Sequence, residues 1–450
     1  MSASAQPELT SEQADEIIRG RPFVGLLVLA GIVGFVVSFA AWLFLEGTYQ
    51  LQQLLFKDLP DSVGIDGDLP LWYLVVVLAV AGVIVAFAVA RLPGKGGHIP
   101  AHGLAGGDPA QPIDVPGIML AAVGSIGFGL VLGPEAPLIA LGTGLAIYTV
   151  HLTRREVPPQ AMMIIAAGGS FAALSFIFES PIIAAIILIE ATGLGGAQQR
   201  LVLLPGLLAA GLGSLVSIGI GSVTGLNTSD YALGALPLPK FDEPSVADFF
   251  WAILLAAVIA VVVQLMLRIG RETEKLATPR PFVVLPAVGV AVAVLAFIFG
   301  AATDQSSVSV LLSGQDALPV LISGADDWPL ATLALLLLCK GLAYSLSLGS
   351  FRGGPTFPAL FLGAAAGLMA AELPGFSETP AVAVGMAAAA VAVLRLPLSA
   401  AVLGILLTAE AGAGSSPLII VAVVVAMIIT LRFSNRMEPE PDAAPTASPG

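Results

Sequence analysis

The ten residues GPEAPLIALG at 133–142 decide the fold, because they return 221 residues later as GPTFPALFLG at 354–363. Both copies keep the pattern G-P-x-x-P and a glycine five positions beyond its second proline. A second pair, SPIIAA at 180–185 and LPLSAA at 396–401, is separated by 216 residues. Two matches at nearly the same spacing indicate that the chain consists of two related halves.

The repeat divides the chain into a few expected segments. Thr10 and Gln13 resemble a capping box that starts a short amphipathic helix at the membrane surface. The last residues are rich in proline, alanine and acid, which is typical of disorder. The sequence thus predicts a cytoplasmic N-terminal segment at 1–22, a first membrane repeat at 23–225, a linker at 226–247, a second membrane repeat at 248–432 and a disordered cytoplasmic tail at 433–450.

The composition places both halves in a membrane. Of 450 residues, 57% are hydrophobic and 11% are charged, against roughly a quarter charged in soluble domains. These values exclude a soluble enzyme and a disordered chain. The net charge of −13 also excludes a nucleic-acid binder, because nothing could neutralise a run of phosphates. The single cysteine, Cys339, excludes a disulfide framework and a cysteine metal site, and we expect neither a metal nor a cofactor.

The apolar stretches predict an all-α polytopic membrane protein. Five stretches are long and continuous enough to span a bilayer: 23–46, 71–90, 201–222, 249–267 and 282–300. Others are interrupted by glycine and proline: 116–150, 161–192, 306–324, 328–373, 379–411 and 416–432. Broken stretches predict tilted or half-spanning helices that end inside the membrane, which is tolerated only in protein or beside a polar cavity. Inverted repeats of this kind are a transporter architecture.

The basic residues predict the orientation, because cytoplasmic loops are rich in lysine and arginine. With both termini in the cytoplasm, 13 of the 18 basic residues face that side: Arg19, Arg21, Arg91, Lys95, Arg154, Arg155, Arg200, Arg268, Arg271, Lys275, Arg280, Arg432 and Arg436. The loops 47–70 and 226–247, which are richer in acid, would then face outwards.

Each G-P-x-x-P motif predicts the start of a helix, with proline at the first helical position. A helix start presents free N–H groups and about half a positive charge. Two such ends that converge at membrane depth would make an anion site without a full positive charge. We expect its ligands to be backbone N–H groups near Ala136 and Phe357, together with the Thr356 hydroxyl.

Glu135 lies in the first turn of one of these helices. At membrane depth an ionisable residue indicates function more often than simple capping of its helix. Its carboxylate would occupy the N–H groups that an anion would use, and protonation would release it. We therefore predict that Glu135 is a gate that competes with the anion.

Two further polar features have more than one interpretation. Lys340 lies in an apolar stretch, where it either attracts anions electrostatically or packs and caps backbone carbonyls. His98 and His102 flank Pro100, and without a carboxylate or cysteine cluster they predict polar loop residues near the inner mouth rather than a metal site.

At these residues the chain resembles the CLC family of chloride channels and chloride/proton exchangers, over about 23–432. The family's G-[KR]-E-G-P resembles GPEAP at 133–137, its G-x-F-x-P region resembles GGPTFP at 353–358, and its G-S-G-I-P resembles GGHIP at 96–100. The resemblance implies anion-binding roles for Gly97, His98 and Ile99. It also implies a homodimer whose interface comes from 181–220 and 397–432.

The chain departs from the family pattern at several positions. Gly97 stands where the family places an anion-binding serine, and Pro134 replaces a basic residue. Pro355 cannot donate a hydrogen bond, and we find no counterpart of the family's central tyrosine. The inner proton-transfer glutamate of the exchangers corresponds to Ala191, with Glu190 beside it as a candidate for an inner proton path.

These observations predict a CLC-type anion permease in the lipid of a bacterial inner membrane, channel-like or weakly coupled to protons. It would conduct chloride or a similar monovalent anion through a site gated by Glu135. A chloride/proton antiporter, or a divergent carrier of bicarbonate, nitrate or fluoride, is the alternative. A remote alternative is an intramembrane enzyme, which would need a nucleophile with a base, paired aspartates or metal ligands at membrane depth.

Overall fold

The computed structural model describes residues 10–104, 109–152, 157–193, 195–226 and 233–437. Within these ranges the chain is helical, and the one β-type pairing joins Gly133 to Gly354 as an isolated antiparallel bridge. The first half contains α1 (Ser11–Arg19), α2 (Arg21–Gln53), α3 (Leu59–Ser62), α4 (Leu71–Arg91), α5 (Val115–Ala122), α6 (Glu135–Leu152), α7 (Pro159–Ile177), α8 (Pro181–Thr192) and α9 (Gly196–Thr224).

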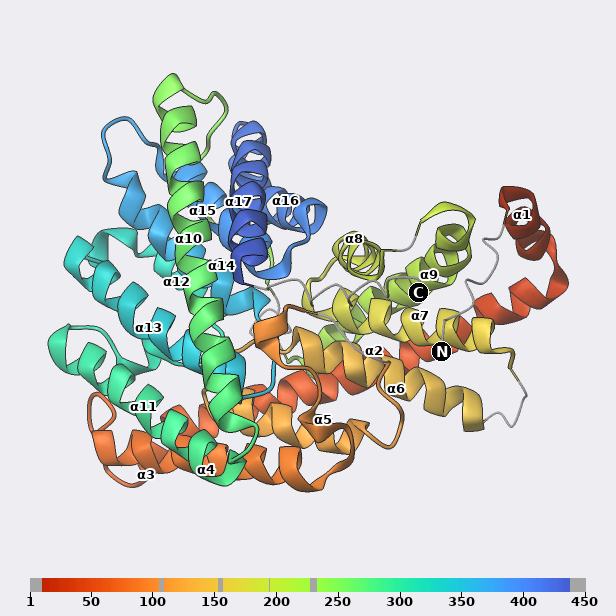
Figure 1. Cartoon of the computed structure of the whole chain (residues 1–450), viewed down its shortest axis with the longest axis horizontal. Helices are drawn as coiled ribbons and strands as arrows, with labels where there is room; N and C mark the ends of the chain where they lie inside the picture. The colour runs from red at the N-terminus through yellow and green to blue at the C-terminus, as the bar shows by residue number, and fades with distance from the viewer. Residues whose placement is uncertain (1–9, 105–108, 153–156, 194, 227–232, 438–450) are drawn as a thin grey trace, which may run out of the picture.

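The second half repeats this order, and Figure 1 shows its helices gathered beside those of the first half. It contains α10 (Val246–Ala277), α11 (Pro281–Ala302), α12 (Ala317–Ser323), α13 (Leu330–Ser350), α14 (Thr356–Ala371), α15 (Glu378–Leu394), α16 (Pro397–Leu407) and α17 (Ser416–Met437). Three of the expected segments lie partly outside the described residues. These are the N-terminal segment at 1–9, the linker at 227–232 and the C-terminal tail at 438–450.

Equivalent helices pack in equivalent ways in the two halves. In the first, α7 packs against α2, α6, α8 and α9; in the second, α15 packs against α10, α14, α16 and α17. The pairs α4 with α11 and α8 with α16 join one half to the other. The fold is therefore an inverted repeat of broken helices, as the two sequence motifs predict.

The five continuous stretches each lie within one long helix, as predicted. Among the described residues, eight helices are long and apolar enough to cross a membrane, and several shorter apolar helices accompany them. One expectation was wrong: 416–432 is not broken, because α17 runs without interruption from Ser416 to Met437. Its proline, Pro417, lies in the first turn, where a missing N–H breaks no helical hydrogen bond.

The capping box predicted at the N-terminus is present. The Thr10 side chain accepts from the Gln13 amide, and the Gln13 side chain accepts from the Thr10 amide, so that α1 begins at Ser11. Arg200 Nη1 lies 2.8 Å from Asp15 Oδ1 and ties α1 to α9. The predicted cytoplasmic residues Arg154 and Arg155 lie outside the described residues.

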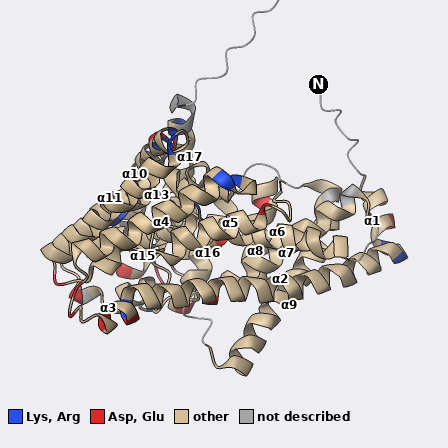
Figure 2. Cartoon of the chain, turned by 90° about the horizontal axis from the view of Figure 1, so that it is seen from below, with Lys and Arg blue, Asp and Glu red and all other residues tan. Residues whose placement is uncertain are grey.

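Charged residues are sparse along the helices and gather towards the edges of the molecule in Figure 2. Between those edges large apolar side chains are exposed, for example Val28, Phe35 and Phe39 on α2. Exposed apolar side chains on a continuous helix face are expected where lipid, rather than water, surrounds the protein. A multi-pass membrane protein accounts for both observations.

Candidate anion site

The two motifs meet where the repeat predicts. Gly133 N–H donates to the Gly354 carbonyl at 2.8 Å, and Gly354 N–H donates to the Gly133 carbonyl at 2.5 Å. Just beyond this bridge α6 begins at Glu135 and α14 begins at Thr356. The prediction that each helix begins at its proline was wrong by one residue, because Pro134 and Pro355 each come directly before the first helical residue. Neither proline of the motif breaks a helical hydrogen bond, because the first comes before the helix and the second lies in its first turn.

Glu135 joins the two helix starts directly. Its side chain is fully buried, and Oε1 accepts a hydrogen bond from the Thr356 amide of α14 at 2.5 Å. Glu135 Oε2 and Thr356 Oγ1 are both buried here. The carboxylate therefore occupies the N-terminus of the opposite helix, where the Thr356 hydroxyl and the Phe357 amide also interact with it.

Glycine is required on both sides of this carboxylate. A Cβ atom at Gly133 would overlap Glu135 Oε2, and a Cβ atom at Gly354 would overlap both carboxylate oxygens. The bridge of two glycines thus leaves a hollow that the Glu135 carboxylate fills. This explains why the repeat keeps glycine at these two positions, a reason that the sequence alone did not reveal.

Two aromatic residues border the site. Phe357, the second residue of α14, stacks on Phe178 at the end of α7, with ring centroids 5.3 Å apart and planes 24° apart. Tyr344 is fully buried on α13, and its hydroxyl donates to the Pro355 carbonyl at 2.6 Å. Sequence reasoning missed Tyr344, although a tyrosine in the apolar stretch just before the second motif was an available signal.

Lys340 has the carbonyl-capping arrangement, one of its two predicted roles. Its fully buried ammonium group lies within hydrogen-bond distance of four consecutive carbonyls, those of Ser309, Val310, Leu311 and Leu312, at 3.0, 3.4, 2.7 and 3.3 Å. It also lies 4.6 Å from the centre of the Phe361 ring. Since its charge is engaged by carbonyl oxygens, Lys340 fixes the segment 309–312 beside the site.

The expected anion loop, 96–100, lies next to a buried arginine. Gly97 has φ of +89°, a conformation that disfavours the serine found there in the family. His98 Nε2 lies 3.0 Å from the Gly103 carbonyl, within the same loop. Arg352 packs along Gly96, and its backbone N–H donates to Ser125 Oγ at 3.0 Å. The loop of Gly97, His98 and Ile99 thus borders the segment that leads into α14.

Glu190 has a different environment from that of Glu135. Its carboxylate accepts from the Leu398 amide at 2.8 Å, the Ser399 amide at 2.7 Å and the Ser399 hydroxyl at 2.6 Å. It therefore caps the start of α16. The equivalent helix, α8, has its own cap, because Ser180 Oγ accepts from the Ile183 amide. An inner proton path through Glu190 would have to use a carboxylate that is already engaged with backbone donors.

Together these features define a class of membrane protein in which two buried helix N-termini meet at one carboxylate. The model of the voltage gated chloride channel family matches residues 81–431. The chain belongs to this family, the CLC proteins, whose members are transporters or channels and not enzymes.

Curated relatives and solved structures agree with this assignment. YfeO of Salmonella newport (strain SL254), a candidate ion-transport protein, is 27% identical over 356 residues, which cover 78% of this chain and 81% of that protein. A slow cyanobacterial Cl⁻/H⁺ antiporter has a TM-score of 0.71 at 19% identity, covering 90% of this chain and 94% of its own. A CLC-type fluoride/proton antiporter has a TM-score of 0.69 at 17% identity, with 95% and 98% covered.

Proposed function

We propose that the protein is a gated permease for chloride or a similar monovalent anion, with Glu135 as the gate. The observation that carries this proposal is the hydrogen bond from the Thr356 amide to Glu135 Oε1. A carboxylate in that place takes the backbone donor that an anion would use. Protonation weakens the carboxylate as an acceptor, which frees the helix start for the anion.

The anion binds to backbone dipoles rather than to a full positive charge. The amide of Thr356 and the neighbouring amide of Phe357 are the proposed donors, with those near Ala136 on α6 opposite. Thr356 Oγ1, which is buried and acts on the Glu135 carboxylate, adds a hydroxyl donor. Lys340 supports this geometry only indirectly, because its ammonium group is held by carbonyl oxygens. Weak dipolar ligands allow the ion to leave as readily as it enters.

The proposed function has two forms, which differ in whether anion transport is coupled to protons. Channel-like or weakly coupled transport is favoured by Glu190, whose carboxylate already accepts three hydrogen bonds at the start of α16. Coupled exchange is the alternative, and the two structural neighbours described as Cl⁻/H⁺ and fluoride/proton antiporters favour it. The same neighbours make fluoride, besides chloride, nitrate and bicarbonate, an anion to be tested.

We propose the assembly and location that the family resemblance implies. The chain would form a homodimer through α8, α9, α16 and α17, which expose apolar side chains such as Ile182, Leu215, Leu398 and Ile420. It would lie in a bacterial inner membrane with both termini in the cytoplasm. Division into repeats at 23–225 and 248–432 is part of the same proposal, and it is supported by the matching helix contacts of the two halves.

A liposome experiment tests the function. Purified protein is reconstituted with a pH-sensitive dye inside, and flux of chloride, fluoride, nitrate and bicarbonate is compared with that of empty liposomes. The reversal potential is then measured in combined chloride and pH gradients. A reversal potential that follows chloride alone supports the channel-like form, and one that also moves with pH supports the exchanger. Absence of flux for all four anions would refute the proposed function.

A further inference from the structure

A small pocket lined by two arginines is separate from Glu135. It is a pocket of about 110 Å³ between the end of α10, the end of α15 and the turn that follows Pro100. Its lining residues come from all three elements: Ala101, His102, Gly103, Leu267, Arg271, Val393, Leu394 and Arg395. Two arginines that are distant in sequence therefore face one small cavity.

The positive charge of this pocket is not fully used by the protein. Arg271 Nη2 is buried and has no hydrogen-bond partner among the described residues. A buried donor without an acceptor is costly, so an acceptor inside the pocket would be favourable. Glu274, the nearby carboxylate, is paired instead with His102, with Oε2 2.8 Å from Nε2.

Arg395 occupies a position that normally suits glycine. It is the C-terminal cap of α15 with φ of +57°, in the left-handed region that side chains disfavour. The negative end of the α15 dipole attracts cations and accounts for one arginine there. The helix dipole does not give Arg271 Nη2 an acceptor, however. The end of α15 alone therefore does not explain why two arginines line this pocket. An anion bound in the pocket would give Arg271 Nη2 the acceptor that it lacks.

We propose that this pocket, centred on Arg271 and Arg395, is a loading site for the transported anion at the mouth of its pathway. This rests on the proposed function. Its volume suits a single small inorganic anion rather than a nucleotide. It also adjoins the expected anion loop, because the carbonyl of the pocket residue Gly103 accepts a hydrogen bond from His98 Nε2 at 3.0 Å. We expect this face to be cytoplasmic.

The test compares three arginines in liposomes with oriented protein. Arg271→Gln and Arg395→Gln should raise the KM for the anion on the pocket side at least about tenfold, the worth of one hydrogen bond to a charge. The maximal rate and the response to pH on the Glu135 side should stay unchanged. Arg271→Lys keeps the charge and should recover much of the affinity.

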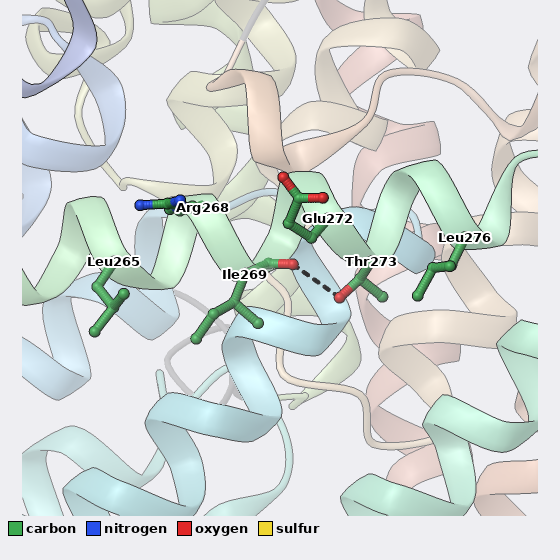
Figure 3. Close-up of a pocket in the computed structure, with 6 residues that line it drawn as sticks. All are labelled: Leu265, Arg268, Ile269, Glu272, Thr273 and Leu276. Carbon is green, nitrogen blue, oxygen red and sulfur yellow. Dashed lines mark hydrogen bonds between the residues drawn. The ribbon is translucent and has the colours of Figure 1, made fainter. Parts of the chain in front are cut away.

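Arg268→Gln is the matched control. Arg268 is on the same helix but lines a different hollow of about 300 Å³, where Figure 3 shows it with Leu265 and Glu272. Its removal changes the net charge of α10 equally and should leave the KM unchanged. An unchanged KM in both Arg271→Gln and Arg395→Gln, with normal flux, overturns the loading site alone. A wild-type protein without flux overturns the proposed function instead. If Arg271→Gln fails to fold, Arg395→Gln and Arg271→Lys decide the matter.

Discussion

Gly133 and Gly354, equivalent residues of the two repeats, are joined by a reciprocal pair of backbone hydrogen bonds of 2.8 and 2.5 Å. The bridge places the starts of α6 and α14 side by side and leaves no room for a side chain at either glycine. Glu135 fills that room, and its carboxylate reaches the Thr356 amide. The position of the proposed gate therefore depends on two glycines as much as on the glutamate.

Replacing Glu135 by glutamine should abolish the response of flux to external pH. The amide keeps the shape of the carboxylate but has neither its charge nor its proton equilibrium. Flux is measured in liposomes over a range of external pH. Glu372→Gln, which removes an exposed carboxylate at the far end of α14, serves as the control and should behave like wild type. A pH response that survives in Glu135→Gln would mean that another group is the gate.

Replacing Gly354 by alanine should lower the free energy of unfolding by about 1–3 kcal/mol, as overpacking does. The added methyl group would overlap the Glu135 carboxylate. In a Glu135→Ala background that carboxylate is gone, so the same substitution should be nearly neutral. Thermal unfolding of the four proteins in detergent forms a double-mutant cycle. Equal penalties in both backgrounds would contradict the contact between Gly354 and Glu135.

Replacing Thr356 by valine should change anion selectivity by about 1.5–3 kcal/mol, the worth of a hydrogen bond to a charge. Valine has the same shape and lacks the hydroxyl, which is buried at the start of α14. Competition between chloride, nitrate and fluoride flux measures the change. Thr143→Val, which removes a hydroxyl bonded to Ser170 within the first half, should keep the selectivity. Thr356 is not a ligand if both variants match wild type.

Replacing Lys340 by methionine should lower the free energy of unfolding by about 1–3 kcal/mol, because buried carbonyls lose their donor. Methionine fills a similar volume and carries no charge. Thermal unfolding measures the loss, and selectivity per folded protein should remain that of wild type. Stable Lys340→Met protein with altered selectivity would instead favour direct electrostatic attraction of anions by Lys340.

Replacing Glu190 by glutamine should destabilise the protein by about 1 kcal/mol, the usual loss for a weakened helix cap. The amide can still accept hydrogen bonds but lacks the charge that favours a helix start. The dependence of the reversal potential on pH should not change, whichever form of transport the wild type shows. Loss of that dependence in Glu190→Gln would place Glu190 on a proton path.

The sequence repeat made it possible to predict that the two helix starts meet. The roles of single polar residues could not be predicted in the same way. Glu135 and Thr356 occupy equivalent places in two copies of one motif, so symmetry predicted that they would meet. Lys340 has no such partner in the pattern, and its two roles were equally compatible with a lysine in an apolar helix. Only the position of the carbonyls of 309–312 distinguishes them.

Other features depend on contacts across large sequence distances. The bond between Tyr344 and the Pro355 carbonyl, and the pocket shared by Arg271 and Arg395, follow from helix packing that no local pattern encodes. The continuous course of α17 shows the opposite limit, because Pro417 lies in a first turn where it does not interrupt the helix. Proline marks a break only when its place in the helix is known.

The different caps of α8 and α16 bear on how the two halves of a repeated chain depend on each other. Two copies of a gene begin as interchangeable parts, and each can supply its own helix caps. Here α8 retains Ser180, while α16 has Leu396 at the equivalent place and depends on Glu190 from the other copy. The second half therefore lacks a side-chain cap of its own for α16, and a first half without Glu190 would leave the amides of Leu398 and Ser399 without this acceptor.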